Sequence, residues 1–335
     1  MRFFQALFAA ILICLVSPAY AASGTGHAGF QRLTTPDGVE VGVWYPSQGE
    51  ERDIPLGLNR QQVIPGGPVS GERLPLVVMS HGTGGSFAGH ADTAVALAKA
   101  GFVVAALTHP GDNWKDQSKA TEIANRPAAL SRLIDFMLGG WSGHSAIDAS
   151  RIGAFGFSSG GFTVLTAAGG IPDLSLIRAH CAAHPGRFDC QLIAKHPGDA
   201  PAKAPKSWPA RRDARIKALA VAAPALGFTF ADGGLDAVRM PVQLWRADDD
   251  KVLPPAEYAD AVRDALPSAP EFHTVPHAGH FDFLAPCDGP VSIPALCTSA
   301  PGFDRAAFHR SFDADVTAFF TRTLAPAQAA TSADQ

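Results

Sequence analysis

Short apolar runs alternate with stretches of helical composition along most of the chain. Apolar runs predict strands at residues 74–80, 102–107, 152–157, 216–223, 241–245 and 271–275. Apolar spacing or composition predicts helices at residues 88–100, 126–138, 162–170, 255–265 and 303–324. This alternation is typical of an α/β fold, in which helices cover both faces of a mostly parallel sheet.

Two stretches interrupt the alternation. Residues 46–73 follow a further predicted strand at 39–45, are rich in Pro, Gly and Gln, and are interpreted as a surface loop. Residues 171–213 contain prolines, lysines and two cysteines but show little periodicity. We interpret them as an insertion that forms a cap or lid over a site. A disordered surface excursion is the alternative, and the cysteine pair argues against it.

The N-terminal residues 1–21 have the pattern of a signal peptide. Arg2 precedes an apolar segment, and residues 17–21 supply an A-x-A cleavage site. The apolar segment is shorter than the roughly 20 residues that a membrane span needs. We therefore expect a periplasmic or secreted protein without a stable membrane anchor, with one domain over residues 22–325 and a loose tail at 326–335.

Cysteine usage fits this expectation. Four cysteines follow residue 21, and an even number in an exported chain favours disulfides. Of the three possible pairings we expect the local ones, Cys181–Cys190 and Cys287–Cys297, because each joins two points of one loop. The absence of any C-x-x-C motif argues against a zinc ribbon or a thioredoxin-like site.

Composition sets wider limits on function. The chain has 335 residues, of which 47% are hydrophobic and 17% charged, so it can bury a substantial core. The formal net charge of −4, without a long basic run, gives no indication of nucleic-acid binding. We expect neither a cofactor nor a bound metal, and the sequence leaves the oligomeric state open.

The first candidate for chemistry is the segment 156–160, Gly-Phe-Ser-Ser-Gly, which lies between a predicted strand and a predicted helix. A G-x-S-x-G motif in this context is typical of a nucleophile elbow, which exposes the Ser158 hydroxyl at the end of a sheet. Glycines on either side allow the strand and the helix to approach closely. For the motif alone, a Gly- and Ser-rich turn without function is the alternative.

Two later loops supply partners for Ser158. An acid within residues 248–250 and a histidine within 277–280 each follow a predicted strand, in the order serine, acid, histidine. Ligands of open α/β sheets bind at this carboxyl edge, so we predict a catalytic triad there. His280 is the expected base and His277 the other candidate. No carboxylate or cysteine with ligand spacing supports a metal site at this histidine pair.

An oxyanion hole needs two backbone N–H groups. Ser159, directly after the nucleophile, supplies one, and the loop 81–85, His-Gly-Thr-Gly-Gly, is placed to supply the other. We expect the Thr83 N–H to be that donor. A Gly-rich turn with no role is the alternative for this loop.

Three passages, at residues 76–85, 151–161 and 276–283, carry a family resemblance. The chain resembles the α/β-hydrolase branch that holds platelet-activating-factor acetylhydrolases and predicted dienelactone hydrolases. The resemblance implies an α/β-hydrolase fold, with Ser158 as nucleophile, His280 as base, and Thr83 and Ser159 as oxyanion donors.

The resemblance also bears on the acid and on the reaction. In the acid loop of this fold the carboxylate commonly precedes an apolar pair and a proline, which favours Asp250 over Asp248 and Asp249. Phe157 stands where the acetylhydrolases usually have histidine, and Ser158 where true dienelactone hydrolases have cysteine. We expect an enzyme that hydrolyses a small-molecule carboxylic ester. A peptidase or amidase with the same triad, or a non-catalytic binding protein, are the alternatives.

Overall fold

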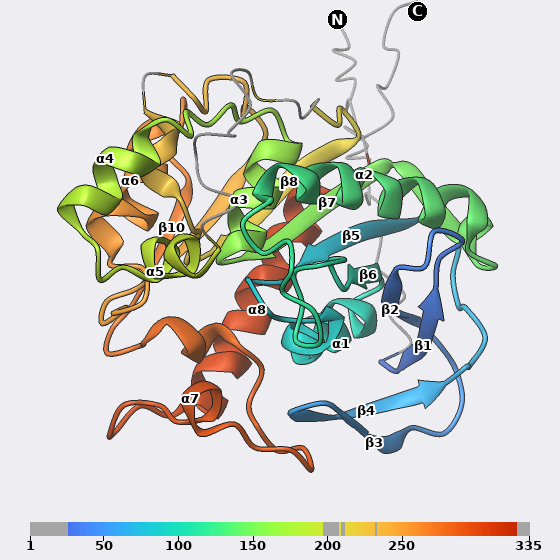
Figure 1. Cartoon of the computed structure of the whole chain (residues 1–335). Coiled ribbons are helices and arrows are strands. Elements are labelled where there is room, and N and C mark those ends of the chain that lie inside the picture. Colours follow the sequence, from blue (N-terminus) through green and yellow to red (C-terminus); the bar gives the residue numbers. More distant parts are fainter. Residues whose placement is uncertain (1–25, 197–207, 209–211, 232, 327–335) are drawn as a thin grey trace, which may run out of the picture.

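The computed structural model describes residues 26–196, 208, 212–231 and 233–326, and within them ten strands form one twisted sheet (Figure 1). The order across the sheet is β10-β9-β8-β7-β5-β6-β2-β1-β4-β3. The strands span Ala28–Thr34 (β1), Glu40–Pro46 (β2), Arg52–Leu56 (β3), Asn59–Pro65 (β4), Leu74–Ser80 (β5), Val103–Leu107 (β6), Ile147–Phe157 (β7), Ile216–Ala222 (β8), Val242–Ala247 (β9) and Glu271–Val275 (β10).

Strand direction divides the sheet into two parts. The six strands from β10 to β6 run parallel, whereas β2 is antiparallel to both β6 and β1. The predicted mostly parallel sheet is therefore confirmed. Because β5, β7, β9 and β10 are parallel, the loops that follow them emerge at the same edge of the sheet, where the candidate residues lie.

Helices cover both faces of the sheet (Figure 1). On one face α1 and α8 pack together, and on the other face lie α2, α3 and α6. Their bounds are Ala91–Lys99 (α1), Arg126–Asp135 (α2), Ser159–Ala167 (α3), Ala259–Ala265 (α6) and Arg305–Thr323 (α8). Successive side chains of a strand point to opposite faces, so in β7 Ala154 joins the core beneath α3 while Phe155 packs against Phe312 of α8.

The interpretation of residues 46–73 as a surface loop was wrong in part, because β3 and β4 form an antiparallel hairpin there. Two polar residues on the buried face of β4 hide the strand pattern. Gln61 accepts a hydrogen bond of 2.7 Å from Trp44 Nε1, and Asn59 donates one of 2.9 Å to the Ala88 carbonyl. These bonds lower the cost of burying the two amides, although Gln61 Nε2 has no partner within the described residues, so a strand can carry them inward.

The described part of the 171–213 insertion forms two short helices, α4 (Leu176–Ala183) and α5 (Phe188–Lys195). The predicted disulfide Cys181–Cys190 links them, and Arg187 and Asp189 contact Glu257 and Tyr258, which follow β9. The insertion therefore packs on segments that leave the carboxyl edge of the sheet. Residues 197–207 and 209–211 of this insertion lie outside the described residues.

The second predicted disulfide, Cys287–Cys297, is also present, and it closes the loop that contains α7 (Pro294–Cys297). Both predicted pairings are thus confirmed. The predicted signal peptide at 1–21 and residues 327–335 of the predicted tail lie outside the described residues. Among the helices of the described ranges, none has the length and apolar character to cross a membrane.

Candidate active site

Ser158 lies at a sharp turn between β7 and α3. Its backbone has φ 55° and ψ −120°, a conformation that is strained for a residue with a side chain. A Cβ atom added at Gly156 would overlap the Gly160 carbonyl, and one added at Gly160 would overlap the Ser80 carbonyl oxygen. The two glycines are therefore required by the close approach of the strands and the helix, which explains the spacing of the motif.

Three side chains from three loops meet at this turn. His280 Nε2 lies 3.1 Å from Ser158 Oγ, and His280 Nδ1 lies 2.7 Å from Asp250 Oδ2. All three residues are buried, with Asp250 5% exposed and His280 4% exposed. A carboxylate at Nδ1 favours the tautomer that carries its proton there, which leaves Nε2 free to accept the serine proton.

The other candidate acids and the other candidate base lie elsewhere. Asp248 pairs with Arg246 at 2.6 Å, and Asp249 lies 3.7 Å from His277. The His277 side chain is 84% exposed.

Asp250 is held in place by the backbone. Its carboxylate accepts hydrogen bonds from the backbone N–H groups of Val252 and Leu253, at 2.9 and 2.7 Å, which fix it opposite the imidazole of His280.

The His280 loop is held by groups that the sequence analysis did not identify. The Asp282 carboxylate accepts hydrogen bonds from Gly279 N–H at 2.8 Å and from Arg305 Nε at 3.1 Å. Phe157, the residue that departs from the family pattern, packs on the imidazole of His280 with ring centroids 4.8 Å apart. In the sequence, Asp282 is marked by its position two residues after the candidate base.

The loop 81–85 lies directly beside Ser158. Thr83 Oγ1 and Ser159 Oγ form a hydrogen bond of 2.7 Å, which brings the two predicted oxyanion residues together. Within the described ranges, the backbone N–H groups of Thr83 and Ser159 donate to no other protein group. These two N–H groups are therefore free to donate to another group.

Other titratable clusters are internally paired. His180, Asp189 and Cys190 lie together, but the Cys190 sulfur belongs to a disulfide. Asp92, His309 and Asp313 meet between α1 and α8, where His309 Nδ1 lies 2.6 Å from Asp92 Oδ2 and Asp313 accepts from Thr93 Oγ1. His90 and His309 are also buried, at 4% and 2% exposed.

The sheet, the sharp turn at Ser158 and the order of the loops define an α/β-hydrolase fold. The chain is similar over 89% of its length to a ferulic acid esterase from Streptomyces cinnamoneus, 89% of which is covered, with a TM-score of 0.58 and 18% identity. At this identity the likeness shows the fold, and the predicted fold class is confirmed.

The sequence pattern of a family described as "Platelet-activating factor acetylhydrolase, isoform II" matches residues 54–131, which confirms the resemblance found in the sequence. A comparison with curated proteins finds no match. The matched segment contains the loop 81–85 but not Ser158, Asp250 or His280. The match to this family pattern supports an ester hydrolase, while the roles of the three buried side chains depend on their geometry.

Proposed function

We propose that the protein is an exported serine hydrolase that cleaves carboxylic esters. The observation that carries the proposal is the continuous contact from Asp250 through His280 to Ser158, at 2.7 and 3.1 Å. The N–H groups of Thr83 and Ser159, near this contact, have no hydrogen-bond partner among the residues that the structure describes. A nucleophile, a base, an orienting acid and oxyanion donors are the complete set that acyl transfer requires.

The reaction follows from these positions. Ser158 Oγ attacks the acyl carbon while its proton passes to His280 Nε2, and the carbonyl oxygen becomes an oxyanion that accepts from Thr83 and Ser159 N–H. The intermediate collapses to an acyl-enzyme, and His280 gives its proton to the departing alcohol. Water then enters, gives a proton to His280 and attacks the acyl carbon. As the acid leaves, His280 returns that proton to Ser158 Oγ, which restores the resting serine and the neutral histidine. Asp250 stays ionised throughout and stabilises the imidazolium.

The insertion 171–213 acts in this proposal as a cap that shapes the substrate pocket. Its described helices pack on Glu257 and Tyr258, which leave the sheet at the same edge as Asp250. The two disulfides fit an oxidising compartment, and with the predicted signal peptide they support a periplasmic or secreted enzyme.

The test is a panel of p-nitrophenyl esters of increasing acyl length, assayed beside a matched p-nitroanilide. We expect ester turnover that Ser158→Ala lowers by roughly three or more orders of magnitude. A fluorophosphonate should label Ser158 in the native protein. Faster cleavage of the anilide than of the ester would make the protein an amidase, and labelling at Ser159 would contradict the assignment of the nucleophile.

A further inference from the structure

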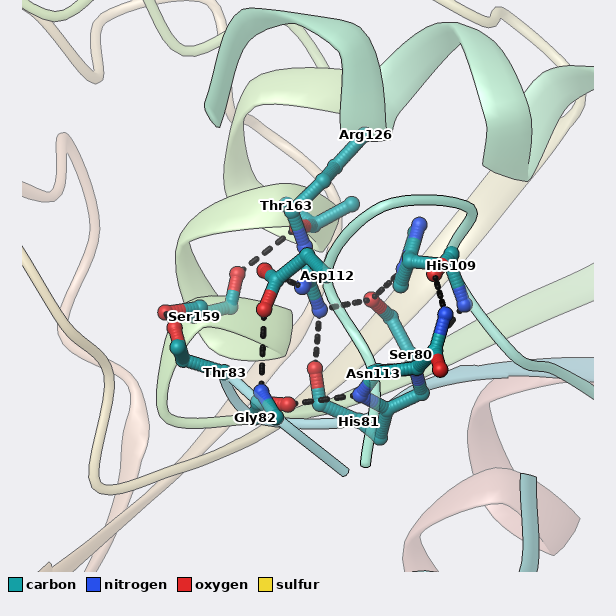
Figure 2. Close-up of polar contacts among 11 residues, drawn as sticks. Ser80, His81, Gly82, Thr83, His109, Asp112, Asn113, Arg126, Ser159 and Thr163 are labelled. Carbon is teal, nitrogen blue, oxygen red and sulfur yellow. Dashed lines mark hydrogen bonds and ion pairs between the residues drawn. The ribbon is translucent and has the colours of Figure 1, made fainter. Parts of the chain in front are cut away.

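A buried ion pair lies behind the loop 81–85 and outside the triad. Arg126, the first residue of α2, and Asp112, in the loop after β6, are each 3% exposed and are joined through Arg126 Nη1 and Asp112 Oδ2. Figure 2 shows the guanidinium between the loop and the start of α3. Neither residue has a part in the acyl-transfer chemistry described above.

The pair reaches both segments that carry the oxyanion donors (Figure 2). On the Thr83 side, Arg126 Nη2 donates to the His81 carbonyl, and Asp112 Oδ1 accepts from Gly84 N–H at 2.9 Å. His81, two residues before Thr83, and Gly84, directly after it, are thus held by the two partners of one ion pair.

The connection to the Ser159 side runs through Thr163. Arg126 Nε donates to Thr163 Oγ1 at 3.0 Å, and Thr163 Oγ1 donates to the Ser159 carbonyl at 2.7 Å. Ser159 is in turn bonded to Thr83 through the two hydroxyl groups. A single guanidinium therefore bonds to the segment that contains Thr83 and, through Thr163, to the segment that contains Ser159.

Two neutral histidines complete the support of the loop. Burial, together with the nearby charge of Arg126, holds the pKa of His81 and of His109 well below the usual range. His81 Nε2 accepts from His109 N–H at 2.9 Å, so the ring proton lies on Nδ1 and donates to the Gly82 carbonyl. The loop is consequently tied down at His81, Gly82 and Gly84, which flank Thr83.

We propose that Arg126 and Asp112 are positioning residues that hold the Thr83 and Ser159 N–H groups at the separation a tetrahedral oxyanion needs. The inference rests on the proposed function, because it assigns a role within that site. Burying two charges is a poor way to gain stability, since well-packed apolar residues often do as well or better. Fixing the geometry of donors is a use for which a rigid, multiply bonded guanidinium is suited.

The experiment compares Asp112→Asn, Arg126→Lys and Thr163→Val with Arg215→Gln. Arg215 precedes β8 and forms ion pairs with Asp213 and with Asp135 at the end of α2. It therefore lies at the edge of the sheet opposite to Ser158. Active sites are titrated with a fluorophosphonate, so that kcat refers to intact sites. We expect the first three variants to lose about 10- to 100-fold in kcat with KM within about twofold, since a lost oxyanion donor costs about 10²–10³-fold. Arg215→Gln should keep its kcat.

Affinity for a trifluoromethyl ketone, which forms a tetrahedral adduct with the serine, separates positioning from general stability. It should fall in parallel with kcat in the three variants, and affinity for the product carboxylate should change little. Suppose that Thr163→Val, and whichever of Asp112→Asn and Arg126→Lys folds, each keep the kcat of the native protein per titrated site. That result would overturn this inference and leave the proposed function standing. A native protein that neither cleaves esters nor is labelled at Ser158 would overturn the proposed function, and this inference with it.

Discussion

Asp250 differs from Asp248 and Asp249 in the hydrogen bonds that its carboxylate accepts. One oxygen accepts from two backbone N–H groups, and the other lies 2.7 Å from His280. Asp248 instead pairs with Arg246 on the half-exposed side of the loop. The three neighbours thus have different surroundings although their sequence positions are adjacent.

We expect Asp250→Asn to lower ester turnover by about four orders of magnitude, because an amide favours the wrong tautomer of His280. Asp248→Asn and Asp249→Asn should keep near-native turnover and change the free energy of unfolding by at most about 1 kcal/mol. Turnover and melting temperature of the three variants provide the measurement. Near-native turnover in Asp250→Asn, with a large loss in either neighbour, would move the acid to that neighbour.

At the scale of elements, the junction of β7 and α3 depends on the absence of a side chain at Gly156 and Gly160. A Cβ at Gly160 would meet the backbone of β5 at Ser80, which cannot move without distorting the sheet. Gly139, at the end of the α2 region, has open space around its Cα and no left-handed backbone. Gly160, which is closely packed, and Gly139, which is not, form a matched pair for testing this constraint.

Gly160→Ala should lower the free energy of unfolding by about 1–3 kcal/mol or more and should also lower turnover, because it displaces the elbow. Gly139→Ala should be neutral or stabilising by up to about 1 kcal/mol, because it restricts the unfolded chain. Denaturant unfolding and ester assays measure both effects. Equal stability of the two variants would contradict the close packing at the elbow.

The insertion is a second element with its own constraint. The Cys181–Cys190 bridge connects α4 to α5, and Arg187 and Asp189 connect this region to the loop after β9. The bridge closes a short loop, so it should limit local opening of the insertion more than it alters the sheet.

Replacing both Cys181 and Cys190 by serine should lower the free energy of unfolding by about 2–3 kcal/mol, through the gain in entropy of the unfolded chain. Cleavage within residues 171–196 by a protease should become faster, while fluorophosphonate labelling of Ser158 persists. Unchanged proteolysis in the double variant would show that the bridge does not restrain the insertion.

For the whole molecule, buried histidines couple stability to pH. Burial lowers the pKa of His90 to about 4, and the rings of Phe155 and Phe157 lie against it. Below about pH 6.5 the unfolded chain binds a proton at this position that the folded protein does not. This histidine therefore reduces stability as the pH falls from about 6.5 toward 4. His309, whose pKa is raised because Asp92 outweighs burial, acts in the opposite direction.

We expect His90→Phe to remove part of the loss of stability on acidification. A shift from 6.5 to about 4 corresponds to about 3 kcal/mol between pH 7 and pH 4. The measurement is urea unfolding of the native protein and of the variant at several pH values, with the difference between them plotted against pH. A difference that does not depend on pH would mean that His90 titrates alike in both states.

The sequence determined the order of the main strands and helices, and it determined which short segments supply the candidate site residues. Apolar runs predict buried strands because apolar side chains must leave water. The elbow motif can be found from local sequence because its glycines and serine lie in one turn. The disulfide pairs were also predictable, since each joins cysteines only 9 or 10 residues apart in the chain. The β3–β4 hairpin was not, because Asn59 and Gln61 are buried through bonds to distant groups.

Only the tertiary structure decided which members of each candidate set meet. It brought Asp250 and not its neighbours to His280, and it left His277 exposed. It also placed Arg126 and Asp112 between two segments far apart in the chain, where no local pattern marks them. The physical reason is that a side chain's partners depend on strand register and helix packing. Local sequence does fix a turn, but it does not fix which distant backbone or side chain will lie within hydrogen-bond distance of it.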